Sequence, residues 1–276
     1  MKALVTGAFL PIDRNQADTH ARYDAEVRFL PCFAVQLAVG TLSHHRRTQM
    51  NRILAVVTNQ ATYGTDPHQT GLWLAELVHF YAGALQAGFE VDIVSPAGGR
   101  VPLDPRSTRW ADKQTRDYMN DHAFMSGLND TSSATDVDPD RYAAIFYTGG
   151  HGVMWDFPSN AALQQAARQI YENGGVVSSV CHGACGLLNI RLSDGSLLVE
   201  GRTVTGFSTA EERVAMVKKR VPFLLEDELR NRGARYIRNT IPMTPFATAD
   251  GRLVTGQNPY STKVVTAKII ETLHQL

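Results

Sequence analysis

The chain has 276 residues, of which 43% are hydrophobic and 20% are charged, and Lys+Arg equals Asp+Glu at 27 each. These values describe an ordinary globular protein with enough apolar residues for one sizeable α/β domain or two small ones. The balanced charge argues against nucleic acid or an anionic membrane as a partner. No apolar run reaches the roughly 18 residues that would span a bilayer.

The three cysteines, Cys32, Cys181 and Cys185, are too few for a disulfide framework. An odd, low count is typical of a reducing compartment, so we expect a cytoplasmic protein. Cys181 and Cys185 lie four residues apart without a second Cys/His pair at zinc-finger spacing. We therefore expect no structural metal.

Residues 1–49 differ from the rest of the chain. The apolar stretch 29–42 follows a long acidic segment and has no clear cleavage site after it, which is unlike a signal peptide. A clean strand begins directly after Met50. We therefore predict a catalytic domain over 50–276 and a dispensable or poorly ordered extension over 1–49. The alternative is an N-terminal arm that packs on the domain or on a partner.

From Met50 onward, predicted strands and helices alternate. Strands are expected at 53–58, 89–95, 142–148 and 176–180, of which 89–95 alternates apolar and polar residues. Helices are expected at 69–87, 110–122 and 160–172, the last with Ser159 as its cap. A strand near 202–206, helices near 210–219 and 223–231, strands near 235–237 and 253–255, and a helix near 262–273 follow. This alternation predicts an α/β fold whose mostly parallel sheet is covered by helices on both faces.

The fourth strand ends at Cys181, followed by His182 and Gly183, with a further helix expected from Gly186. A polar residue at the carboxyl end of a core strand faces the crevice where ligands bind. A nucleophile on a sharp strand-to-helix turn is exposed, and the nearby helix N-terminus favours a thiolate. The alternative is a buried cysteine that packs as a small hydrophobic residue.

Glu76 is the only formally charged residue between Asp66 and Glu90. A carboxyl group on an otherwise apolar helix is expensive to bury as an anion, so we expect its pKa to be raised. Such a group both takes and gives a proton near neutral pH. The alternative is that this part of the helix is exposed.

Two further motifs complete the predicted site. The glycines at 149–152 expose backbone N–H groups, so Gly150 and His182 are candidate donors of an oxyanion hole, although a plain glycine turn is also common. The His182 ring is expected to reach back to the sulfur, oriented by Glu211 or Glu212. Alternatively, these two glutamates are solvated in the first turn of a helix.

Together these residues resemble the DJ-1/PfpI superfamily of the class I glutamine amidotransferase-like fold, and most of all its Hsp31-like branch. Seven segments carry the resemblance, in this order: TGLWLAE (70–76), GFEVDIVSP (88–96), GGHG (149–152), VCHG (180–183), VTGFS (204–208), PFLLE (222–226) and VTGQNP (254–259).

The resemblance implies a flavodoxin-like sandwich with Cys181 as nucleophile, His182 as its histidine and Glu76 as the acid beside the thiol. By register, Glu212 matches the triad acid better than Glu211. Members of this branch are glutathione-independent glyoxalases (D-lactate dehydratases) that convert methylglyoxal to lactate without metal or cofactor, and many are homodimers. Deglycase, aminopeptidase and holdase chaperone activities are also reported, so a cysteine amidase or peptidase and a chaperone are the alternatives.

One position departs from the family pattern. Ala184 stands where many relatives have proline, and Cys185 follows it. The second thiol could resolve an oxidised Cys181 or simply pack, and we favour packing.

Overall fold

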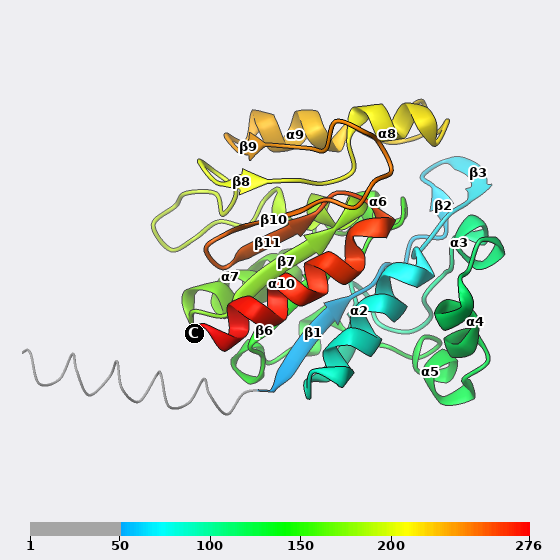
Figure 1. Ribbon diagram of the computed structural model, residues 1–276, viewed down its shortest axis with the longest axis horizontal. Coiled ribbons are helices and arrows are strands. Elements are labelled where there is room, and N and C mark those ends of the chain that lie inside the picture. The colour runs from blue at the N-terminus through cyan, green and yellow to red at the C-terminus, as the bar shows by residue number, and fades with distance from the viewer. Residues whose placement is uncertain (1–50) are drawn as a thin grey trace, which may run out of the picture. The chain divides into compact units, whose positions relative to one another are not determined.

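The computed structural model describes residues 51–276, so the predicted extension over 1–49 lies outside the described residues. A seven-stranded sheet forms the centre, with the strand order β10-β11-β7-β6-β1-β4-β5. Its strands β10, β11, β7, β6 and β1 are labelled in Figure 1. The strands are Arg52–Val56 (β1), Glu90–Ser95 (β4), Ser132–Ser133 (β5), Ala144–Tyr147 (β6), Val176–Val180 (β7), Ala247–Asp250 (β10) and Leu253–Gly256 (β11).

Within this sheet only β10 and β11 pair in antiparallel fashion, and all other neighbours are parallel. Leaving out the two-residue β5, the parallel strands follow the flavodoxin-like order 2-1-3-4-5. The predicted fold is therefore confirmed. In such sheets ligands bind at the carboxyl ends of the strands where the strand order reverses, which here lies between β1 and β6.

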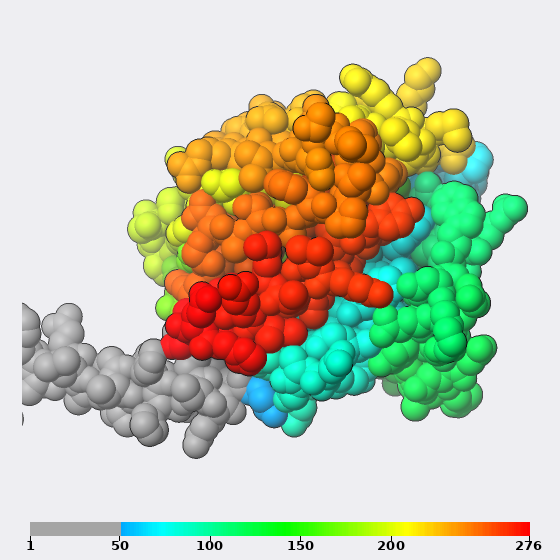
Figure 2. All heavy atoms as spheres, in the orientation of Figure 1, coloured from blue at the N-terminus to red at the C-terminus, as the bar shows by residue number. Residues whose placement is uncertain are grey.

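Helices cover both faces of the sheet. α2 (Leu74–Gln86) packs on one face, because its Phe80 ring stacks on Phe146 of β6 with centroids 3.9 Å apart. α7 (Ala161–Glu172) packs on the other, because the next residue of β6, Tyr147, donates a hydrogen bond to the Leu163 carbonyl. α10 (Thr262–His274) lies beside α2 (Figure 2). These layers hold the start of α2 close to the ends of β6 and β7.

The start of α2 differs from the prediction. The helix expected over 69–87 begins only at Leu74, because Asp66–Gln69 forms strand β3 and Gly71 has a φ of +145°, which no helix residue adopts. Glu76 consequently lies in the first turn of α2 rather than in its middle.

The helix expected over 110–122 is wrong as well. Three short helices occupy this region, α3 (Pro105–Arg109), α4 (Lys113–Met119) and α5 (His122–Gly127). Asp104, Asp112 and Asp121 each accept a hydrogen bond from a first-turn N–H, so each aspartate starts a new helix. In the same way, Asn160 caps α7, in place of the predicted Ser159.

Short elements surround the sheet. Strands β8 (Thr203–Val204) and β9 (Arg235–Tyr236) form a parallel pair. Together with α8 (Thr209–Val214) and α9 (Leu225–Asn231), this pair lies on the side of the sheet that carries β10 (Figure 1). The hairpin of β2 (Thr62–Tyr63) with β3, and strand β10, were not predicted. The remaining elements are α6 (Val153–Asp156), η1 (Ala134–Asp136), η2 (Pro139–Arg141), η3 (Cys181–Leu187) and η4 (Pro259–Ser261). Within residues 51–276, no helix has the length and apolar character needed to cross a membrane.

Candidate active site

Cys181 stands at the carboxyl end of β7 in a conformation that few side chains adopt. Its φ of +57° lies in the left-handed region, which costs on the order of 1–3 kcal/mol for a residue other than glycine. The turn leads at once into the 3₁₀-helix η3, not into a helix that opens at Gly186 as predicted. A strained turn of this kind presents a nucleophile at the edge of a parallel sheet.

Gly149 and Gly183 allow this turn to approach β6 and α2. A Cβ atom on Gly183 would lie 2.3 Å from the Tyr147 carbonyl oxygen, and one on Gly149 would lie 2.6 Å from Glu76 Oε2 and 2.9 Å from Cys181 Cβ. Any larger residue at Gly149 would therefore push the carboxyl group of Glu76 away from the cysteine. The segments that carry Glu76 and Cys181, about 100 residues apart in the sequence, meet at Gly149.

The Glu76 side chain is completely buried. Its Oε2 accepts a 2.7 Å hydrogen bond from the Gly149 N–H, while its Oε1 has no hydrogen-bond partner within residues 51–276. Burial raises the pKa of Glu76 to about 8, against the smaller opposing effects of Cys181 and the Gly149 amide. This carboxyl group therefore mostly holds its proton at neutral pH, in agreement with the expectation from its apolar sequence.

The Cys181 thiol is also buried, and its pKa is raised well above the ordinary value. Desolvation is the main cause, and the adjacent Glu76 adds to it, while the His182 backbone N–H acts in the opposite direction. The expectation that the turn favours a thiolate is therefore wrong, because one backbone amide does not outweigh burial. A base must take the thiol proton when the sulfur attacks.

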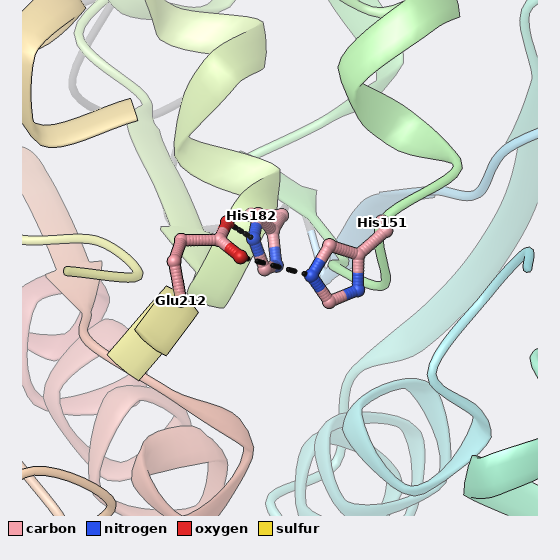
Figure 3. A group of neighbouring side chains, drawn as sticks. All are labelled: His151, His182 and Glu212. Carbon is pink, nitrogen blue, oxygen red and sulfur yellow. Dashed lines mark hydrogen bonds and ion pairs between the residues drawn. The ribbon is translucent and has the colours of Figure 1, made fainter. Parts of the chain in front are cut away.

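His182 is placed to act as that base. Its Nδ1 lies 3.4 Å from Cys181 Sγ, and its Nε2 lies 2.6 Å from Glu212 Oε1 (Figure 3). A carboxylate only accepts hydrogen bonds, so Nε2 carries the proton and Nδ1 is free to accept one from the thiol. Burial opposes the charge of Glu212, but His182 and His151 outweigh it and hold the pKa of Glu212 well below its usual value.

The structure separates the two neighbouring glutamates on α8. Glu212 contacts His182, whereas Glu211 forms a capping box with Ser208 and accepts further hydrogen bonds from the Met243 N–H and the Asn258 side chain. Both are buried, so the alternative of a solvated pair is wrong. Glu211 supports the start of the helix, and Glu212 supports the histidine.

The two predicted oxyanion donors have different surroundings. The His182 N–H lies on the sulfur side of the turn, where it affects the thiol pKa. Gly150 has a φ of +104° and packs against the backbone of Gly71 and Trp73. The Gly149 N–H already donates to Glu76, so it is not available to an oxyanion.

Two residues that the sequence did not single out complete the group. His151, noted only as part of a glycine turn, lies with its Nε2 3.4 Å from the second oxygen of Glu212. Arg106 of α3 lies 3.1 Å from the other nitrogen of His151. A signal for His151 existed in the sequence, because it follows two glycines at the end of a strand that neighbours β7. No comparable signal pointed to Arg106.

The donor atoms of His151, His182 and Glu212 all lie within 4.8 Å of one another, which is compatible with a metal site. Their geometry fits hydrogen bonds better. The 2.6 Å separation of His182 and Glu212 is that of a charge-assisted hydrogen bond, and the guanidinium of Arg106 beside His151 would repel a cation.

The Cys185 thiol forms its hydrogen bond with α6 and not with the residues of the candidate active site. It is buried and donates to the Val153 carbonyl at 3.3 Å, and burial raises its pKa well above the ordinary value. This placement favours the packing role expected for the second cysteine.

Comparisons with known proteins agree on one group of relatives. The model of the DJ-1/PfpI family matches residues 71–272. The chain is 32% identical over 238 residues to the "Glutathione-independent glyoxalase HSP31" of Saccharomyces cerevisiae, covering 80% of this chain and 97% of that protein. It is 31% identical over 218 residues to "Glyoxalase 3" of Candida albicans, covering 76% and 92%.

Solved structures show the same similarity. Rapid Encystment Protein 24 KDa of Francisella tularensis superposes with a TM-score of 0.78 at 35% identity, covering 81% of this chain and 99% of that one. Glyoxalase III from Candida albicans gives a TM-score of 0.74 at 29% identity, covering 81% and 97%.

Proposed function

Because the chain belongs to the DJ-1/PfpI family, we propose that it is a glutathione-independent glyoxalase, which converts a small 2-oxoaldehyde such as methylglyoxal into the 2-hydroxy acid. Its relatives named glyoxalases support this assignment over most of the chain. In this proposal Cys181 is the nucleophile, His182 and Glu76 move protons, Glu212 orients His182, and the Gly150 and His182 amides bind the developing oxyanion.

One observation carries the proposal: a buried carboxyl group that holds its proton lies beside the candidate nucleophile. A glyoxalase must remove a proton from one carbon and return a proton to its neighbour. Glu76, with a pKa of about 8 and its Oε1 without a hydrogen bond to residues 51–276, is suited to exchange protons with a substrate bound at Cys181 in both directions. Amide hydrolysis needs a nucleophile and a base but no such second acid.

The steps balance without an external oxidant. The sulfur of Cys181 bonds to the aldehyde carbon while the thiol proton passes through His182 to the carbonyl oxygen, which gives a hemithioacetal. Removal of the carbon-bound proton forms an enediol, and reprotonation at the adjacent carbon gives a thioester. The first carbon is thereby oxidised and the second reduced. Water then cleaves the thioester, which releases the 2-hydroxy acid and restores the thiol.

The burial of the site favours a small substrate. The exposed fraction is 3% for Cys181, 1% for His182 and 0% for Glu76, which leaves little access for an extended peptide. A cysteine amidase, peptidase or deglycase would use the same Cys181 and His182, and this burial argues against the peptidase form. A cytoplasmic location, a homodimer and the absence of a cofactor stay predictions from the sequence and its family resemblance.

The test is an assay of the purified full chain with methylglyoxal in the absence of glutathione, with lactate measured as product. Cys181→Ala should lower kcat/KM by more than about 10³-fold, since it removes the nucleophile. Cys185→Ala is the matched control, because that buried thiol faces Val153 and should leave turnover close to wild type. Retention of more than about a tenth of the activity by Cys181→Ala would rule out the covalent scheme. Suppression of client aggregation that survives Cys181→Ala would instead favour a holdase chaperone.

A further inference from the structure

Glu212 has two imidazole neighbours, but the proposed chemistry uses only one of them. Oε1 accepts from His182 at 2.6 Å, and Oε2 faces Nε2 of His151 at 3.4 Å (Figure 3). The two rings also lie against each other, with centroids 4.0 Å apart. His151 is therefore buried in the centre of the site without an assigned role.

The protonation pattern of His151 follows from its other neighbour. A guanidinium carries N–H donors and no acceptor, so the Nδ1 atom that lies 3.1 Å from Arg106 must be the unprotonated one. The proton of the neutral ring is then on Nε2, where it points at Glu212. In this tautomer both imidazoles present an N–H to the same carboxylate.

Arg106 is itself held firmly. Its Nε donates to Asp104 Oδ1 at 3.0 Å. Its Nη2 lies 2.6 Å from Asp104 Oδ2, 2.6 Å from the Tyr63 hydroxyl and 3.1 Å from His151 Nδ1, so its two hydrogens are shared among these three acceptors. Asp104 is completely buried and also caps α3. The orientation of Arg106 is thus fixed by Asp104 and Tyr63.

We propose that Arg106 and His151 are positioning residues: Arg106 fixes His151 as the neutral Nε2–H tautomer, and His151 holds Glu212 so that its other oxygen orients His182. The inference rests on the proposed function in so far as His182 is the base that serves Cys181. Neither residue needs to touch the substrate, because both act through Glu212.

The charged and titratable groups around His151 support this role. Arg106 from α3, His182 from η3 and Glu212 from α8 face the ring, with Tyr63 of β2 beside it and Asp104 behind Arg106. Burial is the main reason that the pKa of His151 is lowered to about 4; His182 and Arg106 also lower it, against the effect of Glu212. His151 is therefore neutral near neutral pH.

The first test measures the tautomer directly and does not depend on any activity. In nitrogen-15 NMR spectra of the full chain, His151 should appear as the Nε2–H tautomer and stay neutral from pH 8 to pH 5. In Arg106→Met the pKa of His151 should rise, because a positive neighbour that lowers it is lost. Arg106→Lys should keep much of the effect. Arg109→Met, the same change on the exposed end of α3, should match wild type. A wild-type His151 that is protonated on Nδ1, or that titrates above pH 6, would overturn the proposal.

The second test measures turnover in the same variants. Arg106→Met should lower kcat by about ten-fold with KM within about two-fold, and should lose activity more steeply as the pH falls from 7 to 5, because His151 then gains a proton beside Glu212. A folded Arg106→Met protein with the kcat and pH profile of wild type would contradict the proposal.

His151→Gln and His151→Phe give a second measurement. Gln keeps an N–H donor and should retain most of kcat, whereas Phe keeps only the ring shape and should lose about as much as Arg106→Met. Equal kcat for the two would also contradict it. A wild-type chain that makes no lactate would refute the proposed function, while the NMR result would still decide the arrangement.

Discussion

Glu76 and Glu212 are equally buried, yet the site holds them in opposite protonation states. Glu76 lies at the start of α2 with one backbone N–H as partner, and its pKa is raised to about 8. Glu212 lies on α8 between two imidazoles, and its pKa is held well below the ordinary value. Burial pushes both pKa values upward, so the neighbours alone account for the difference.

This difference assigns the two roles. A buried carboxyl group without a cationic partner keeps its proton and can exchange it, whereas one between histidines stays an anion and can only orient and stabilise charge. The side of the site near α2 therefore carries the exchangeable proton, and the side near α8 carries the fixed charge.

The largest expected effect is that of Glu76→Gln. The amide has the shape of the carboxyl group and can still accept from the Gly149 N–H, but it cannot transfer a proton. We expect kcat for methylglyoxal to fall by about 10³-fold, within the range for general acid–base catalysis. The thermal midpoint should not fall. A Glu76→Gln protein with more than a tenth of wild-type turnover would remove Glu76 from the chemistry.

Glu212→Gln should have the next largest effect. Glutamine has one oxygen and one NH₂ group, so it cannot accept from both His182 and His151, and one imidazole must turn away. We expect kcat/KM to fall by about 10²-fold, equivalent to about 2.7 kcal/mol of transition-state stabilisation. Unchanged kcat/KM would show that His182 does not depend on Glu212.

The pH dependence of stability should distinguish the two carboxyl groups without any substrate. Folding raises the pKa of Glu76 from 4.5 to about 8, so its contribution is fully present below pH 4.5 and is lost as the pH rises towards 8. Between pH 5.5 and 7.5, wild type should lose on the order of 2–3 kcal/mol of unfolding free energy relative to Glu76→Gln. Glu212 acts in the other direction: its contribution is present above pH 4.5 and is lost as the pH falls below that value. Urea unfolding of wild type and Glu76→Gln at several pH values gives the comparison, and parallel curves would contradict the raised pKa.

The sequence predicted the sheet, its parallel direction and the position of Cys181, because buried β-branched runs and their spacing are local signals. It also predicted that Glu76 is buried, since no other charged residue lies near it in the chain. It placed the start of α2 too early, because the hairpin of β2 and β3 depends on contacts that lie outside the apolar periodicity.

The parts of the site that the sequence left open depend on tertiary contacts. Glu211 and Glu212 are adjacent and chemically identical, and only the rotation of α8 decides which one faces His182. Arg106 reaches His151 from a helix that begins about 45 residues earlier in the chain and that was itself predicted wrongly. The sign of the Cys181 pKa shift likewise follows from burial in three dimensions, which a turn motif does not reveal.

The smallest of these effects, Glu211→Gln, tests whether the two neighbours on α8 are separate in function. Glu211 accepts hydrogen bonds from the Ser208 N–H and hydroxyl, the Met243 N–H and the Asn258 amide. In glutamine an NH₂ group replaces one of the two carboxylate oxygens, and this group cannot accept the two hydrogen bonds that the oxygen accepted. We therefore expect a loss of about 1–2 kcal/mol in unfolding free energy. Because Glu212 keeps its own partners, kcat/KM should stay within about three-fold of wild type. Urea unfolding and the lactate assay measure both quantities on one preparation.

Glu212→Gln, the same change at the neighbouring residue, is the matched control and should show a large loss of kcat/KM. If Glu211→Gln instead lost activity as severely as Glu212→Gln while remaining folded, α8 would have to be treated as one unit, and the separation of structural and site glutamates would fail.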